Sequence, residues 1–304
     1  MPQFNSSIEP VLGTRVAFRF EADDEVSARA AERLALDEFE RLEAMFSAYR
    51  VNSAWNRWRR NELDAESLPL EIVEVLEFAE RWHTISGGAF NPSIGVIRER
   101  WRNAIEQQDL PSRSEMSDLA GTIERLPYRV TNRRVERLGD CSLLDLHAVA
   151  KGWIVVRAAA LAQEAAGIAS TVVNAGGDLV RLGPGGIVID VEDPRDPFDN
   201  AAPLVRAHLR QGGFATSSPS RRPLRIGDLT LHHVVDPRTG WPVEHVRSAS
   251  VCAPDAATAD AIATVVGVLP VEEGLAAVAG FTGVGCCLLD ADGVMWRSGA
   301  WLDA

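Results

Sequence analysis

Ser170-Thr-Val-Val-Asn-Ala-Gly-Gly-Asp-Leu-Val-Arg-Leu182 is the stretch in which the chain changes from helices to short strands. Ser170–Asn174 predicts a strand, the pair Gly176-Gly177 breaks it, and Leu179–Leu182 predicts a strand again. No helical pattern separates the two strands, whereas a doubly wound parallel sheet alternates strands with helices. The stretch therefore favours an α+β fold, with mostly antiparallel sheets packed with helices.

Helical periodicity dominates the first half of the chain. The expected helices run from Asp23 or Asp24 to Phe46, from Pro69 to the stop at Gly87-Gly88, over 94–107 and over 149–166. Two further helices are expected over 256–268, with Asp255 as N-cap, and over 271–279. No internal repeat or long linker interrupts the chain, so residues 1–304 are expected to form a single domain.

Short apolar runs bounded by turn residues predict strands in the second half. The expected strands are Tyr128–Thr131, Val135–Leu138, Cys141–Leu146, Ile187–Val191, Leu204–Leu209, Thr230–Val235 and Ser248–Cys252, followed by a closing hairpin over 285–289 and 294–297. The segment Gly212–Ser218 has the composition of a loop.

The composition excludes several classes of protein. An apolar fraction of 46% suffices for a full core, and a net charge of −12 argues against a nucleic-acid-binding surface. No apolar run is long enough to span a bilayer, and the N-terminus lacks the pattern of a secretory signal. The cysteines form no CxxC pair and have no histidine at zinc-finger spacing. We expect a reduced, cytoplasmic protein without nucleic-acid partners or membrane insertion.

Asp260 and Thr264 lie four residues apart, on one face of an expected helix. That face carries no Lys, Arg or Glu, so it is expected to meet protein or a ligand rather than water. A buried aspartate must be paired or bind a metal, and Mg²⁺ prefers carboxylate and other hard oxygen ligands. The spacing is equally compatible with a structural pair, in which Asp260 bonds local backbone and Thr264 bonds its own helix.

Other segments could bind an anion or have a purely structural role. The glycines of Asn174–Asp178 allow close approach of a ligand to the backbone, or form an ordinary turn. Lys151 near the start of a helix suits an anion, or is an exposed lysine. After His233, the turn Asp236-Pro-Arg-Thr-Gly240 offers the cation Arg238 to a phosphate. The phosphate-binding motifs GxxxxGK[ST] and GxGxxG are absent.

The order of these segments resembles that of a known family. The series is Leu12-Gly-Thr14, Phe46-Ser-Ala-Tyr49, Gly88-Ala-Phe-Asn-Pro-Ser-Ile-Gly95, Asp145-Leu-His-Ala-Val-Ala-Lys-Gly152, Asn174-Ala-Gly-Gly-Asp178, Ala215-Thr-Ser-Ser218, His233-Val-Val-Asp-Pro-Arg-Thr-Gly240 and Ala259-Asp-Ala-Ile-Ala-Thr264. It is similar to the ApbE-type FAD:protein FMN transferases over nearly the whole chain. The last two segments, HxxDPxTG followed by ADAxAT, are the most specific.

The resemblance implies a T-fold-like α+β domain that binds FAD and Mg²⁺. Family members cleave the FAD pyrophosphate and pass FMN to a threonine hydroxyl of an acceptor protein, with AMP as leaving group. Some instead hydrolyse FAD to FMN and AMP. An FAD pyrophosphatase and a non-catalytic FAD-binding protein are therefore the alternatives.

The resemblance also implies roles for individual residues. Asp260, Thr264 and the Ala148 carbonyl would hold Mg²⁺, and His233 would lie near the reacting phosphate. With Arg238, the cation that the turn offers to a phosphate, His233 and Asp260 form the expected catalytic group. The FAD-binding set would be Thr14, Tyr49, Phe90, Asn91, Lys151, Gly176, Gly177, Asp178, Thr216 and Ser217. Within that set, Thr216 and Ser217 would contact phosphate, and the segment Gly176–Asp178 would line the flavin.

The chain departs from the family pattern at four positions. Family members usually have methionine where Leu12 stands, aspartate where Asn91 and Val156 stand, and glycine where Ser218 stands. Asn91 keeps a polar contact but loses a charge. Ser218 adds a Cβ where backbone is expected to approach a phosphate.

Overall fold

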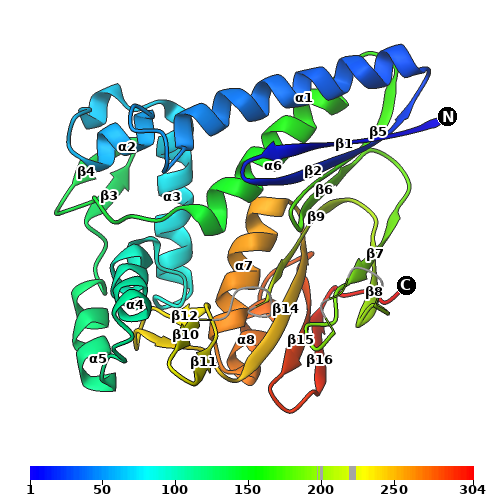
Figure 1. The fold of residues 1–304 in the computed structure, drawn as a ribbon. Helices are drawn as coiled ribbons and strands as arrows, with labels where there is room; N and C mark the ends of the chain where they lie inside the picture. Colours follow the sequence, from blue (N-terminus) through cyan, green and yellow to red (C-terminus); the bar gives the residue numbers. More distant parts are fainter. Residues whose placement is uncertain (197, 199–200, 219–223) are drawn as a thin grey trace.

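The computed structural model describes residues 1–196, 198, 201–218 and 224–304. An eight-stranded sheet runs through the molecule, and each pair of neighbouring strands is antiparallel (Figure 1). In spatial order its strands are β1 (Gln3–Val11), β2 (Thr14–Ala22), β5 (Ile168–Ala175), β6 (Asp178–Leu182), β9 (Gly212–Ser217), β14 (Val246–Ala253), β15 (Gly285–Asp290) and β16 (Met295–Gly299). The predicted α+β fold with a mainly antiparallel sheet is confirmed.

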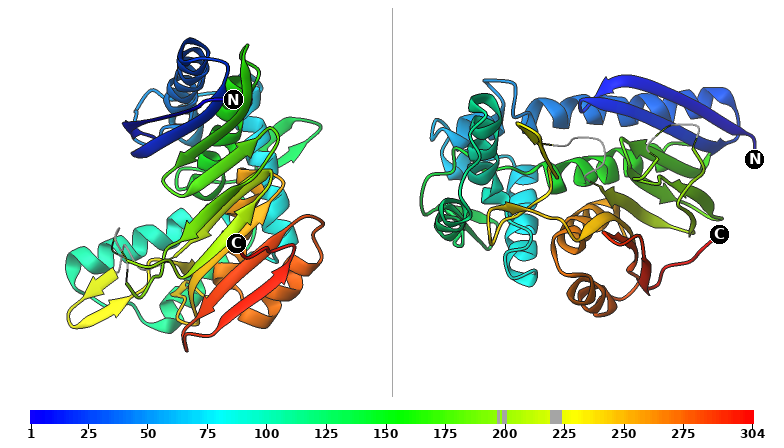
Figure 2. Two further views of the ribbon diagram at one scale, coloured as in Figure 1. Left: turned by 90° about the vertical axis from the view of Figure 1, so that its right-hand side faces the viewer. Right: turned by 60° about the horizontal axis from the view of Figure 1, so that its bottom comes forward.

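Four helices pack against one face of this sheet. They are α1 (Glu25–Phe46), α6 (His147–Gln163), α7 (Ala256–Val268) and α8 (Val271–Ala279). Alternate residues of β2, namely Val16, Phe18 and Phe20, point into the core beneath α1, where the ring of Phe18 meets that of Phe39 edge-on at 6.4 Å. Figure 2 shows the twist of the sheet from β1 and β2 at one end to β15 and β16 at the other.

Smaller elements gather at one side of the sheet, at the left of Figure 1. They are α2 (Ala54–Arg59), α3 (Leu70–Ile85), α4 (Gly95–Gln107), α5 (Arg113–Thr122), the short 3₁₀ helices η1 (Ala65–Ser67) and η2 (Pro92–Ile94), and the hairpins β3 (Tyr128–Thr131) with β4 (Arg134–Arg137), β10 (Leu224–Ile226) with β11 (Leu229–Leu231), and β12 (Val235–Asp236) with β13 (Trp241–Pro242). The indole Nε1 of Trp101 in α4 donates to the carbonyl of Gly240 at 2.9 Å. This hydrogen bond connects the Asp236–Gly240 turn to helix α4.

A hairpin covers part of the other face of the sheet. It consists of β7 (Ile187–Val191) and β8 (Val205–Leu209), and it shares a second apolar cluster with Leu179, Phe214 and Trp301. Within the described residues, no helix combines the length and apolarity needed to cross a bilayer.

Most of the expected helices lie where the sequence placed them. Helix α7 occupies residues 256–268, with Asp255 as N-cap accepting from the amide of Thr258 at 2.8 Å. Helix α1 begins after Asp24, which accepts from Ser27 N at 2.8 Å. The N-terminal hairpin β1–β2 and helices α2 and α5 were not predicted.

Three expectations about strands were wrong. Residues 141–146 contain a turn at residues 142 and 143 and no strand, because the carboxylate of Asp140 bonds the amide and hydroxyl of Ser142 and so competes with a ladder. The strand expected over 230–235 is split between β11 and β12. Gly212–Ser217 is strand β9 rather than a loop. Its glycines allow α7 to approach, since a Cβ at Gly213 would lie 2.1 Å from the amide nitrogen of Ala256.

Candidate active site

The β1–β2 and β5–β6 turns lie side by side at one end of the sheet. The Gly176 amide donates to the carbonyl of Arg15 at 3.2 Å, and a Cβ at Gly176 would lie 2.4 Å from Thr14 Oγ1. Gly176 and Gly177 have φ of +57° and +101°, a region that side chains disfavour. The turn therefore favours glycine at both positions, and Gly176 also allows the approach of Thr14.

Lys151 of α6 reaches this turn. Its Nζ lies 3.2 Å from Oδ2 of Asp178, the first residue of β6, and 3.4 Å from the carbonyl oxygen of Gly176. Asp178 is 3% exposed, so its carboxylate depends on the lysine for compensation. Lys151 is also the only lysine among the 31 lysine and arginine residues of the chain. A single lysine in the chain is a signal that singles out this position.

Asp260 of α7 completes a cluster of three ionisable groups with Lys151 and Asp178. The carboxyl groups of Asp178 and Asp260 lie within hydrogen-bonding reach of each other. Burial is the largest cause that raises the pKa of Asp260 well above its usual value, and the negative charge of Asp178 is the second. Burial likewise raises the pKa of Asp178, while Lys151 opposes that shift.

Gly152 brings the two helices of this cluster together. A Cβ at Gly152 would lie 2.7 Å from the carbonyl oxygen of Ala256 and 2.9 Å from Cα of Ala257. Any larger residue would force α6 away from the first turn of α7. The glycine next to Lys151 therefore sets the separation between the lysine and Asp260.

The donors around Asp260 fit a divalent cation. Its Oδ2 is buried and accepts no hydrogen bond from an amide, hydroxyl or ammonium group of the described residues. Thr264 follows one turn later on the same face of α7, and Ala148 lies in the first turn of α6. No three His, Cys, Asp or Glu side chains gather as a metal site in the described part of the chain. The expected set of one carboxylate, one hydroxyl and one carbonyl is the oxygen-rich type that suits Mg²⁺.

Thr216 and Ser217 end β9 beside this cluster. The ladder pairs Leu179 of β6 with Phe214 of β9, so the C-terminal end of β9 lies next to the start of β6. Thr216 shares a hydrogen bond of 2.8 Å with the hydroxyl of Ser250. Ser217 faces α7, since its Oγ would lie 3.3 Å from a Cβ at Gly267. Both residues are partly exposed.

Arg238 is not joined to the Lys151–Asp178–Asp260 cluster. Its guanidinium pairs with Asp236 at 2.9 and 2.8 Å, and this hydrogen bond raises the pKa of Arg238. It lines a pocket with Ile262 and Val265, which lie roughly 140° to 200° around α7 from Asp260. His233 is partly buried between β11 and β12. The catalytic roles of His233 and Arg238 stay predictions.

Tyr49, Phe90 and Asn91 differ widely in accessibility. Tyr49 is 89% exposed in the segment between α1 and α2, where its ring is available to a ligand. Phe90 is 2% exposed and packs in the core. Asn91 is buried: it accepts from the amide of Ser93 at 2.8 Å and donates to the carbonyl of Ile123 at 2.9 Å. Asn91 therefore holds its loop, and its nucleotide contact remains a prediction.

Val156 and Ser218, two of the departures from the family pattern, have structural contacts. Val156 is partly buried against the main core. The hydroxyl of Ser218 donates to the carbonyl of Arg247 at 3.2 Å. Val156 and Ser218 therefore each fit their positions in this structure, although they differ from the family pattern.

A polar group at the start of α6 was not predicted. Asp145 accepts from the guanidinium of Arg98, from the amide of His147 at 2.8 Å and from the His147 ring. Although burial raises the pKa of Asp145, these hydrogen bonds and charges lower it well below its usual value. Asp145 thereby fixes the first turn of the helix that carries Ala148 and Lys151. Asp145 and Arg98 lie far apart in the sequence, so no local pattern predicted this contact.

Comparisons with known proteins agree on one family. The model of the ApbE family matches residues 12–288. An FAD:protein FMN transferase of Treponema pallidum is 28% identical over 249 residues, which cover 74% of this chain and 66% of that protein. One of Rhodobacter capsulatus is 30% identical over 227 residues, which cover 69% of this chain and 42% of that protein. The aligned part thus spans less than two thirds of either relative.

Two solved structures share the fold over nearly the whole chain. The ApbE protein of Thermotoga maritima has a TM-score of 0.81 at 24% identity and covers 98% of this chain and 97% of its own. The flavin transferase ApbE of Vibrio cholerae has a TM-score of 0.75 at 20% identity, with 98% of both chains covered.

Proposed function

This chain belongs to the ApbE family, and we propose that it transfers FMN from FAD to a threonine hydroxyl of an acceptor protein, releasing AMP. The observation that carries the proposal is the Lys151–Asp178–Asp260 cluster beneath the Gly176–Gly177 turn. It provides a cation, two carboxylates and a glycine turn at one place, as a pyrophosphate with a bound divalent cation requires.

The transfer exchanges one phosphorus–oxygen bond for another. The threonine oxygen of the acceptor attacks the FMN phosphorus, the bond to the bridging pyrophosphate oxygen breaks, and AMP leaves with that oxygen. The hydroxyl proton passes to a base, for which His233 and the carboxylates of the cluster are the candidates.

The chain's own residues bind and orient FAD for this step. The Lys151 ammonium lies where it can balance negative charge on a phosphate beside the glycine turn. Thr14 and the hydroxyls of Thr216 and Ser217 border the same end of the sheet and can donate to phosphate oxygens. Mg²⁺ held by Asp260, Thr264 and the Ala148 carbonyl would neutralise charge on the pyrophosphate.

The test is incubation of the chain with FAD and Mg²⁺, with and without a threonine-containing acceptor domain. AMP, free FMN and protein-bound flavin are measured together, and a chelator provides the metal control. The proposal predicts AMP and protein-bound flavin in equal amounts, only with acceptor and Mg²⁺. AMP with free FMN and no acceptor dependence would indicate an FAD pyrophosphatase. FAD binding with neither product would indicate a binding protein.

A further inference from the structure

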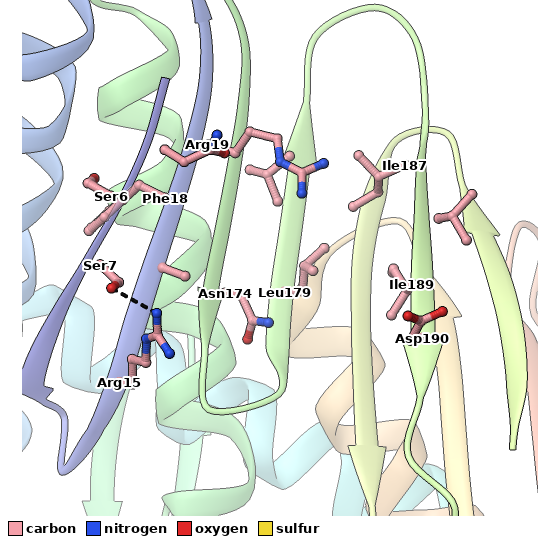
Figure 3. A pocket seen from close by; sticks show the side chains of 14 residues that line it. Ser6, Ser7, Arg15, Phe18, Arg19, Asn174, Leu179, Ile187, Ile189 and Asp190 are labelled. Carbon is pink, nitrogen blue, oxygen red and sulfur yellow. Dashed lines mark hydrogen bonds between the residues drawn. The ribbon is translucent and has the colours of Figure 1, made fainter. Parts of the chain in front are cut away.

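A groove of about 510 Å³ lies on the face of the sheet away from α1, α6 and α7 (Figure 3). Strands β1, β2, β5 and β6 line one side of it, and β7 lines the other. Val172 of β5 and Leu179 of β6 give it an apolar lining. Ser7, Arg15 and Arg19 border it on the β1–β2 side.

The groove is positively charged in a chain whose net charge is −12. Arg15 donates to the hydroxyl of Ser7 at 3.0 Å, and neither Arg15 nor Arg19 forms an ion pair within the described residues. The acidic residue of the groove, Asp190, is already paired with Arg206 at 2.9 Å. Two uncompensated cations therefore remain for a partner of opposite charge.

Strand β7 presents its edge to the groove. Residues 187–190 all line it, although side chains of successive strand residues point to opposite sides. Such a consecutive run means that backbone amide and carbonyl groups face the groove. In the described part of the chain β7 pairs only with β8, so this edge can accept another strand.

The groove ends at the glycine turn of the candidate active site. The side chain of Asn174 lines it and accepts from the amide of Gly177 at 3.0 Å. On the helix side of the same turn, Lys151 contacts the carbonyl of Gly176. A chain lying in the groove can therefore pass around this turn toward the Lys151–Asp178–Asp260 cluster.

We propose that the groove holds the acceptor protein, which lies there as an extended acidic segment. The segment would add to the free edge of β7, with carboxylates paired to Arg15 and Arg19. This inference rests on the proposed function, because that function supplies the acceptor.

The test uses fluorescent peptides of about ten residues. One alternates valine and glutamate around a central threonine, a second has lysine in place of glutamate, and a third is the glutamate peptide with alternate backbone amides methylated. Binding is measured by fluorescence anisotropy. The glutamate peptide is expected to bind about tenfold more tightly than the lysine peptide, and methylation is expected to abolish binding.

The double variant Arg15→Glu with Arg19→Glu is expected to bind the lysine peptide more tightly than the glutamate peptide. The single variant Arg19→Glu is expected to weaken the preference for the glutamate peptide. The matched control is Arg129→Glu with Arg134→Glu, two exposed strand arginines on the β3–β4 hairpin, which should leave it unchanged. Equal binding of the two charged peptides, unchanged preference in the Arg15 and Arg19 variants, or binding of the methylated peptide would overturn the inference.

The proposed function is tested separately, by AMP release from FAD. AMP release without the expected peptide preference would overturn the groove assignment alone. The expected preference without AMP release would contradict the proposed function, and the occupant would then not be an acceptor for FMN.

Discussion

Asp178 and Asp260 bring two carboxyl groups together, one from the start of β6 and one from the middle of α7. Such a pair in a buried position is unfavourable unless a cation compensates it. Lys151 supplies one positive charge. Because the lysine balances the carboxylate of Asp178, the carboxyl group of Asp260 is left to bind Mg²⁺, which would in turn attract a pyrophosphate.

Replacing Lys151 should lower the rate of AMP release more than it lowers the stability of the fold. Lys151→Met removes the ammonium beside Asp178, and we expect AMP release to fall by roughly 100-fold. Lys151→Arg should not restore the full rate, because a planar guanidinium does not replace a compact ammonium. Single-turnover AMP formation checks both variants. A wild-type rate in Lys151→Met would contradict a role at phosphate.

The single lysine permits a chemical test of the same position. An amine-reactive acylating reagent has only Lys151 and the N-terminal amine to modify. The Lys151 side chain is 32% exposed, so it should react, and FAD with Mg²⁺ should protect it. Peptide mass spectrometry gives the extent of modification, and the N-terminus serves as the internal control. Equal labelling of Lys151 with and without FAD would argue against its place in the binding site.

Gly152→Ala should separate α6 from α7. Its Cβ would lie 2.7 Å from the Ala256 carbonyl oxygen, so we expect a loss of about 1 to 3 kcal/mol in the free energy of unfolding, together with loss of FAD binding. Gly121→Ala in α5 is the matched control, because nothing lies within 4 Å of its Cβ. That change should be neutral or stabilising. Denaturant unfolding and FAD titration of both variants provide the comparison.

Asp145 should stabilise the chain in a pH-dependent way. Its folded pKa lies well below the unfolded value of about 3.9, so its contribution is fully present above the unfolded pKa and is lost progressively as the pH falls from there through the folded pKa. Asp145→Asn should lower the free energy of unfolding at pH 7 by roughly 2 kcal/mol and make the acid loss less steep.

Urea unfolding at pH 7 and at pH 3 measures the effect of Asp145→Asn. Glu25→Gln, which breaks an exposed pair with Arg29, should change little at either pH. An equal loss at both pH values would show that the contribution of Asp145 is not electrostatic.

Local signals in the sequence predicted elements well where caps and periodicity agreed. Helices α1 and α7 begin at the capping residues Asp24 and Asp255, because those side chains bond amides of the first turn. The β1–β2 hairpin was missed, although Val16, Phe18 and Phe20 alternate. Strand β9 was missed because its glycines serve the approach of α7, a tertiary cause that local pattern does not reveal.

The candidate site was only partly accessible from sequence. Spacing placed Asp260 and Thr264 on one face, but the approach of Lys151 and Asp178 depends on the packing of α6, α7 and the sheet. The resemblance to the family predicted that these segments form one site. It did not reveal that Arg238 is held by Asp236 on another side of α7.

AMP release by Asp260→Asn tests the central claim most directly. Asparagine keeps the shape of the side chain and removes its charge, so the chain should fold while losing its expected charged Mg²⁺ ligand. Incubated with FAD, Mg²⁺ and acceptor, this variant should form no AMP and no protein-bound flavin, whereas the unaltered chain should form both. AMP formation at the wild-type rate by a folded Asp260→Asn variant would contradict the account.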